Sequence, residues 1–231
     1  LADLSARINQ LGINSGLNGL ELDVFRDRIL KKSQDASIAY NIPVAEVVAA
    51  LESVIQKTGS EKFAEDNIPE LAKAISATGG VDGVSFGQIA AEAFKAGIKD
   101  VGGLLAILSA QGQEGSFELK DLAALSEPLF AAFQPKNTED ARIMGALAQS
   151  FQDSIGDPNR TVTSLASFMS LISDEKKTLK LQQAGAQVLD PEQAAQGIMQ
   201  RLPVDEIIKN IMKATEGNEF ALSAAIADRQ A

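Results

Sequence analysis

The chain of 231 residues has no cysteine, no histidine and no tryptophan. Without cysteine it has no disulfide bonds, and without both cysteine and histidine the usual sulfur and nitrogen ligands of zinc are missing. Nucleophiles activated by histidine are excluded for the same reason. Stability therefore has to come from an apolar core, and the length suffices for one or two domains.

Basic residues are fewer than acidic ones, with 21 against 31 and a formal net charge of −10. This charge repels a phosphate backbone, so direct nucleic-acid binding is not expected. The densest basic cluster, Lys176, Lys177 and Lys180, is followed by no aromatic residue on which bases could stack. We interpret it as a solvated helix face.

Long apolar runs are also missing. The longest, residues 101–110, contains Gly102 and Gly103 and is far shorter than the ~20 residues of a membrane-spanning helix. No basic segment precedes an apolar one near the start, so no signal peptide is predicted. The chain begins at Leu1 without methionine and ends abruptly at Ala231, and we expect it to be a fragment of a longer protein.

What the chain does contain is apolar residues at the helical period of 3.6. One such stripe follows Pro43, a residue that suits the first turn of a helix. The stripes are Val44, Val47, Val48, Leu51, Val54 and Ile55; Phe86, Ile89, Ala90, Ala93 and Phe94; Val101, Leu104, Leu105 and Leu108; and Leu119, Leu122, Leu125, Leu129 and Phe133. We predict an all-α fold, a compact array of roughly ten short to medium amphipathic helices with turns at glycine and proline.

Start and stop signals accompany these stripes. Ser85 with Gln88, and Asp190-Pro191 with Gln193, are typical of helix N-termini. Pro128 should kink or split the helix that contains it. Six glycines follow or close apolar stripes, where a left-handed C-cap favours glycine: Gly59, Gly79, Gly97, Gly112, Gly185 and Gly217.

The stretches between the apolar stripes predict the loops and the domain boundaries. Residues 12–19 are rich in glycine and asparagine and predict a turn-rich loop, and residues 153–161 predict a second loop without the ligand spacing of a calcium loop. Residues 186–189 form the only plausible extended piece. We predict a lead-in of helix and loop (1–35), a helical core region (36–156) and a helical C-terminal region (157–231) packed on that core.

One internal similarity relates residues 42–48 to residues 202–208, each a proline followed by the same apolar stripe. Two occurrences do not make a solenoid, which needs at least three units at a fixed period. We favour two unrelated helices that each begin at a proline.

No group of side chains stands out as reactive. Glu92, Glu114 and Glu127 are acidic residues near apolar helices, but Glu92 falls outside its stripe, and glutamates on helices are usually solvated. Residues 79–83 are glycine-rich but lack the lysine and serine or threonine of a phosphate loop, so they predict a turn between helices. We therefore expect no catalytic, cofactor-binding or metal-binding residues.

Seven phenylalanines largely follow the stripes and are expected in the core rather than in a ligand cage. They are Phe86, Phe94, Phe117, Phe130, Phe133, Phe151 and Phe168. On this basis an aspartate in place of Phe94 should unfold the domain by burying an unpaired charge.

The order of several segments resembles the shared helical region of bacteriophage tail tape measure proteins. The segments are a helix like 43–58, Ala77-Thr78-Gly79, Lys95-Ala96-Gly97-Ile98, residues 104–115, residues 117–125, residues 163–190 and residues 217–222. Each motif alone is weak, and their order over most of residues 36–227 carries the resemblance. The chain departs from the pattern after Asp190, where Pro191 and a helix follow in place of a glycine-containing turn.

The resemblance implies a structural and assembly protein of a phage or prophage virion. In that family a long helical chain lies in the lumen of the tail tube, sets tail length and leaves ahead of the DNA at infection. The implied partners are the tail tube protein, tail assembly chaperones and tail tip or baseplate proteins, with self-association left open. The implied locations are the virion and, during assembly, the host cytoplasm.

The many glycines and prolines exclude one unbroken helix, which would be about 350 Å long. We therefore expect a compact helical domain beside the ruler rather than the ruler itself. Two alternatives remain: a generic helical scaffold that binds partner helices, and, with less support, a peptidoglycan hydrolase module of a phage tail protein, which needs only two carboxylates.

Overall fold

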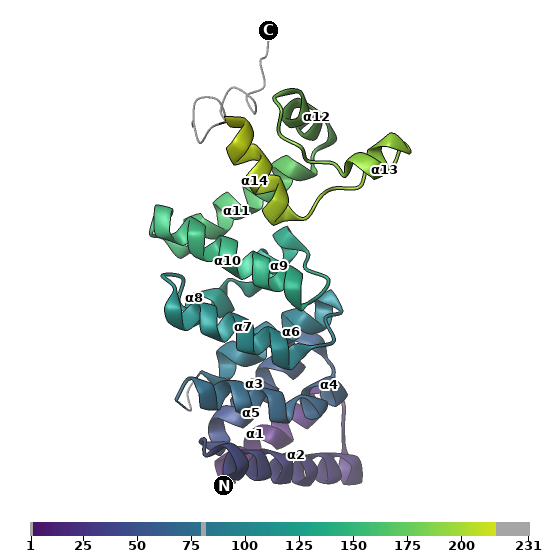
Figure 1. Cartoon of the computed structure of the whole chain (residues 1–231). Helices are drawn as coiled ribbons and strands as arrows, with labels where there is room; N and C mark the ends of the chain where they lie inside the picture. Colours follow the sequence, from purple (N-terminus) through teal and green to yellow (C-terminus); the bar gives the residue numbers. More distant parts are fainter. Residues whose placement is uncertain (1, 80–81, 216–231) are drawn as a thin grey trace. The chain divides into compact units, whose positions relative to one another are not determined.

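The computed structural model describes residues 2–79 and 82–215. This part of the chain is all-α, as the apolar periodicity predicts, with 14 helices and no β-strand (Figure 1). The helices are α1 (Ala2–Asn14), α2 (Gly19–Tyr40), α3 (Val44–Thr58), α4 (Glu61–Asp66), α5 (Ile68–Ala77), α6 (Gly83–Ala96), α7 (Val101–Glu114), α8 (Leu119–Ala124), α9 (Ser126–Phe133), α10 (Thr138–Ile155), α11 (Pro158–Ser173), α12 (Glu175–Gln183), α13 (Pro191–Ala195) and α14 (Val204–Thr215). Eleven of them have seven residues or more, close to the expected ten, and α4, α8 and α13 have six, six and five residues.

The chain divides into two compact units, residues 1–162 and 163–231. The division falls within α11, at residue 162 rather than at the expected residue 156. Residues 1–35, expected as a lead-in, form α1 and most of α2 in the first unit. The packing of the C-terminal region on the core stays a prediction.

Helix α6 is the most enclosed element of the first unit and contacts α3, α5, α7, α8 and α9. Its buried residues are Gly83, Ser85, Phe86, Gly87, Ile89, Ala90, Ala91, Glu92 and Ala93. Because neighbours cover the helix from several sides, burial extends well beyond the apolar stripe that predicted it.

Two glycines allow α6 to approach α3 closely. A Cβ atom on Gly83 would lie 2.1 Å from the carbonyl oxygen of Glu46, and one on Gly87 would lie 2.4 Å from that of Ala50. No side chain fits in either gap. The absence of a Cβ therefore lets the two helix backbones pack directly against each other.

The predicted helix stops are largely confirmed. Gly59 and Gly97 are left-handed C-caps of α3 and α6 with φ of 67° and 73°, and Gly79 and Gly185 follow α5 and α12 with positive φ. The prediction for Gly112 is wrong, since this residue is buried inside α7. A Cβ there would lie 2.8 Å from the backbone of α8, so the glycine serves a close approach rather than a stop. Gly217 lies outside the described residues.

Of the two predicted helix starts, one is confirmed and one is wrong. Asp190 Oδ1 accepts hydrogen bonds from the N–H groups of Glu192 (2.9 Å) and Gln193 (3.2 Å), and Pro191 opens α13. The start at Ser85 is wrong, because α6 begins at Gly83 after Asp82, whose φ is 69°. The local Ser/Gln spacing does not reveal the contact with α3 at Gly83, which sets the true start.

Pro128 splits its helix as expected. Helix α8 ends at Ala124 and α9 begins at Ser126. A continuous helix would need an N–H at Pro128 to bond the carbonyl of Ala124, and the proline ring would clash with that carbonyl.

The loops are shorter than predicted. Of residues 12–19 only 15–18 lie outside helices, and of residues 153–161 only 156–157 do. The expected extended piece is present as one antiparallel bridge between Leu189 and Arg201. The two similar segments both place a helix, α3 and α14, directly after a proline.

Candidate functional site

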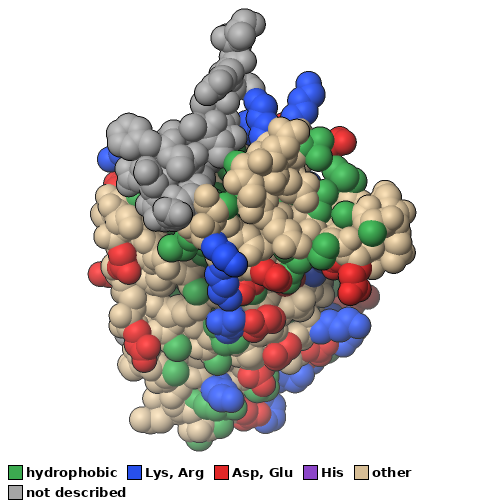
Figure 2. All heavy atoms as spheres, turned by 45° about the horizontal axis from the view of Figure 1, so that its top comes forward, with side chains coloured by type: hydrophobic (Ala, Val, Ile, Leu, Met, Phe, Trp, Pro, Cys, Tyr) green, Lys and Arg blue, Asp and Glu red, His purple; other side chains and the backbone are tan. Residues whose placement is uncertain are grey.

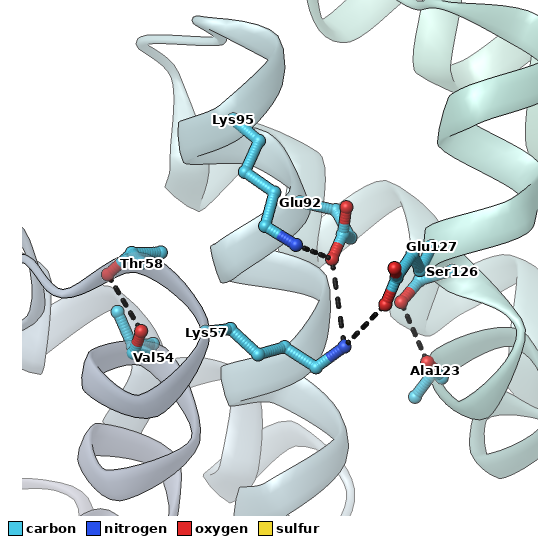
Figure 3. A network of polar contacts seen from close by, with 8 residues as sticks. All are labelled: Val54, Lys57, Thr58, Glu92, Lys95, Ala123, Ser126 and Glu127. Carbon is cyan, nitrogen blue, oxygen red and sulfur yellow. Dashed lines mark hydrogen bonds and ion pairs between the residues drawn. The ribbon is translucent and has the colours of Figure 1, made fainter.

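The first unit contains a charged cluster at the junction of α3, α6 and α9 (Figure 3). Lys57 comes from α3, Glu92 and Lys95 from α6, and Glu127 from α9. Glu92 Oε1 lies 2.9 Å from Lys95 Nζ and 3.7 Å from Lys57 Nζ. Lys57 Nζ lies 3.3 Å from Glu127 Oε2, so one ammonium group bridges two carboxylates.

Local structure explains how each side chain reaches the cluster. Lys57 is in the last turn of α3 and Lys95 in the last turn of α6, where cations are favourable, and Glu127 is in the first turn of α9, where anions are. Glu92 and Lys95 are three residues apart on one helix face. Figure 3 also shows the hydroxyls that bond carbonyls at the adjoining helix ends, Thr58 to Val54 and Ser126 to Ala123.

The expectation that Glu92 is solvated is wrong. Only 5% of its side chain is exposed, because the helices around α6 also cover the face outside the apolar stripe. An unpaired carboxylate at such a depth would cost several kcal/mol. The two lysines offset that cost, and the cluster thereby links three helices.

A hollow of about 400 Å³ lies beside the cluster. It is lined by Glu92, Lys95, Ala96, Glu127, Phe130, Ala131, Gln134 and Pro135. Its volume is within the range of small-molecule pockets. Its charged groups, however, are engaged with one another rather than directed at a shared point.

This arrangement does not favour glycoside hydrolysis. That reaction needs one carboxylic acid to protonate the leaving group and one carboxylate to act as base or nucleophile, with substrate between them. Here the Lys57 ammonium occupies the space between Glu92 and Glu127 (Figure 3). The geometry favours a structural link between helices.

The third acidic candidate, Glu114, is not part of the cluster. It is exposed at the last residue of α7. No sequence pattern indicates the part played by Lys57, which lies 70 residues before Glu127. Only the spacing of three between Glu92 and Lys95 is a local signal, and it gives no information about α3 or α9.

The basic cluster on α12 is a partly solvated helix face. Lys176 is exposed, and Lys177 and Lys180 are partly exposed. Asp174 caps this helix by accepting a hydrogen bond from Lys177 N at 2.9 Å. The expected solvation thus holds for Lys176 and only in part for the other two, and none of the three lysines lines a described pocket.

The phenylalanines divide into three groups. Phe86, Phe117 and Phe130 are buried, as expected, and Phe133, Phe151 and Phe168 are partly buried. Phe94 is 40% exposed, so its placement in the core is wrong. It lies at the end of α6, where its ring packs on Phe63 of α4 with the ring centroids 4.7 Å apart.

The surface carries both signs of charge in close proximity. Figure 2 shows acidic and basic side chains next to one another over the face that it presents. Ion pairs also join neighbouring helices: Arg28 and Lys32 of α2 both pair with Glu65 of α4. Across α1 and α3, the hydrogen-bonded carboxylate of Glu52 raises the pKa of Arg7 further above its ordinary value.

Neither a metal site nor a membrane helix is evident in the described part. Across residues 2–79 and 82–215, no three acidic, histidine or cysteine side chains are grouped to hold a metal ion. No helix in those ranges has the length and apolarity for crossing a membrane. In the glycine-rich turn at 79–83, residues 80 and 81 lie outside the described residues.

Comparison with known proteins identifies no relative: no family model matches the chain, and neither a curated protein nor a solved structure gives a significant match.

Proposed function

We propose that the chain is a folded helical part of a bacteriophage or prophage tail tape measure protein and acts in virion structure and assembly. The observation that carries the proposal is the ordered resemblance of its segments over most of residues 36–227. As part of such a protein the chain would be in the tail tube and would meet the tube protein, tail assembly chaperones and tail tip or baseplate proteins.

The helix boundaries support this proposal. The segments quoted for the resemblance coincide with structural units: α3 follows Pro43, Gly97 caps α6, and Gly79 follows the end of α5. Residues 104–115 and 117–125 correspond to most of α7 and to α8. These segments of the resemblance follow helices and helix ends, whereas residues 163–190 begin inside α11 and residues 217–222 lie outside the described residues.

The character of the charged cluster also supports a structural role over an enzymatic one. Glu92 and Glu127, the two acidic candidates that lie together, are bridged by Lys57. A generic helical scaffold remains the second candidate, because the α-helical packing suits it equally. The genes beside this one distinguish the two, since tail tube and tail chaperone genes are expected only for a tape measure protein.

Mass spectrometry of purified tails from the phage or induced prophage that encodes the chain tests the proposal. Peptides from residues 36–215 should be present in intact tails and lost from particles that have ejected their DNA. Tails that assemble and infect normally without any peptide of this chain would refute the proposal.

The hydrolase alternative predicts release of sugar or peptide from peptidoglycan, and a Glu92→Gln, Glu127→Gln double variant should then abolish that release.

A further inference from the structure

An Asn-Gly pair with few structural restraints joins the α1–α2 turn to the start of α2. Asn18 is exposed and is the N-cap residue of α2, yet its side chain makes no capping hydrogen bond. Gly19 has φ of 54°, and a Cβ atom on it would meet nothing within 4 Å. Within the described part of the chain, the Gly19 N–H has no hydrogen-bond acceptor.

We propose that Asn18 is a site of spontaneous covalent modification through a succinimide ring. The backbone nitrogen of Gly19 forms a bond to Asn18 Cγ, the Cγ–Nδ2 bond breaks, and the Gly19 amide proton leaves with Nδ2 as ammonia. Water then opens the ring at one of its two carbonyl carbons and leaves an aspartyl or an isoaspartyl residue. Water is the one co-reactant, and no electrons are transferred.

The local backbone permits this ring closure. Asn18 is extended, with φ of −149° and ψ of 163°, so its peptide plane has to rotate before Gly19 N faces Cγ. The rotation is opposed by one long helical hydrogen bond, from Leu22 N to Asn18 O at 3.4 Å. Helix ends open readily, and glycine has no side chain to hinder the approach of its nitrogen.

An Asp-Gly pair elsewhere in the chain provides an internal comparison. The same ring closure at Asp82 and Gly83 would expel water in place of ammonia. There, however, Gly83 is buried, and its N–H donates a hydrogen bond of 2.8 Å to Glu46 Oε2. The attacking nitrogen is held by α3, so we expect Asp82 to stay unmodified in the folded chain.

A chain that carries the aspartyl product should stay folded. The aspartyl product adds a negative charge at the N-terminus of α2, which the helix dipole favours, and aspartate caps helices as well as asparagine does. The charge appears two residues before Leu20, whose side chain is 82% exposed. Modification therefore adds a negative charge to the α1–α2 turn, whose residues 15–18 are uncharged, near an exposed apolar side chain and the exposed Glu21.

Peptide-level mass spectrometry of the full chain, incubated at mildly alkaline pH and sampled over days, tests the proposal. The peptide that contains Asn18 should gain the mass of the amide-to-acid change and separate into aspartyl and isoaspartyl forms. The peptide that contains Asp82 should give no isoaspartyl form. An Asn18→Ser variant, which keeps a good cap but cannot form the ring, should lose the product while its melting curve stays that of the parent chain.

A synthetic peptide of residues 13–24 gives the reference rate without tertiary structure. Modification of folded Asn18 within a few-fold of that rate supports the proposal. An unmodified Asn18 under conditions in which the peptide reacts would overturn it. Isomerisation of Asp82 at the same rate as modification of Asn18 would also overturn it, because the structure would then not select the site.

Discussion

The α3–α6 pair and the segment from residue 189 to residue 202 are held in place by different interactions. Helices α3 and α6 pack backbone to backbone at Gly83 and Gly87, and most of α6 is buried. In the second segment no residue of α13 is buried. Its ends are joined by hydrogen bonds from Asp190 N to Gln200 O (2.8 Å) and from Leu202 N to Val188 O (3.0 Å).

The α3–α6 pair is held by packing between residues distant in sequence, and the segment 189–202 is held by local hydrogen bonds. In the first region a small change in side-chain volume affects two helices at once, because close-packed interiors do not yield. In the second, the loss of one hydrogen bond affects a short exposed stretch. Substitutions in the two regions should therefore differ in size and in how far their effects spread.

The largest effect is expected from Gly87→Leu. A Cβ atom at this position would lie 2.4 Å from the Ala50 carbonyl oxygen and 2.7 Å from Ser53 Cβ, so α3 and α6 have to separate. We expect a loss of about 3 kcal/mol or more in the free energy of unfolding, measured by urea titration. Ala45→Leu, on the exposed side of α3, is the control and should change it by less than about 0.5 kcal/mol. Similar values for both variants would contradict the close approach.

Lys57→Met should have the next largest effect. It leaves Glu127 unpaired and Glu92 with Lys95 alone. Because Glu92 is buried, we expect a loss of about 1–2 kcal/mol in the free energy of unfolding. A matched control is Lys62→Met, whose ion pair with Asp66 is solvent-exposed and whose loss should not be measurable. Equal effects at the two positions would show that the cluster is only a surface ion pair.

Phe94→Asp tests whether the exposed end of α6 tolerates a charge that its buried part would not. The apolar stripe alone predicts unfolding, but the structure places this side chain 40% exposed, against Phe63. We expect a folded protein destabilised by about 1–2 kcal/mol, mainly through loss of the ring contact. Phe86→Ala, at a fully buried position, should cost about 3–5 kcal/mol. If a thermal melt showed that the Phe94 variant is completely unfolded, Phe94 would belong to the core, as the apolar stripe predicts.

The smallest effect is expected from Asp190→Ala. This substitution removes the acceptor for Glu192 N and Gln193 N and should cost about 1 kcal/mol locally. Amide hydrogen exchange should accelerate in residues 192–201 and stay unchanged in α3 and α6. Asp190→Asn keeps a good cap and should restore slow exchange. Faster amide exchange throughout α3 and α6 would show that the effect is not local and would contradict the difference between the two regions.

Much of the fold could be predicted from local sequence signals. The stripe after Pro43, the caps at Gly59 and Gly97, and the split at Pro128 each depend on residues within one or two turns of the chain. The cap at Asp190 is equally local. These features were predicted because helix periodicity and backbone preference act over short distances.

The predictions that were wrong depend instead on contacts between residues that are distant in sequence. Gly112 is buried in a helix because α8 passes close to it, and α6 starts before Ser85 because of the contact between Gly83 and α3. The burial of Glu92 depends on helices that are distant in sequence, and so does its pairing with Lys57. No local pattern contains this information, so the cluster could be identified only in the folded structure.

Tail length in particles with an in-frame deletion of residues 1–231 tests the account most directly. If the chain is a compact helical domain of a tape measure protein, electron microscopy should show tails shortened by much less than the about 350 Å that an extended helix of this length would span, or no completed tails at all. Shortening by about 350 Å would show that the segment is part of the ruler, and tails of normal length, number and infectivity would contradict the proposed function.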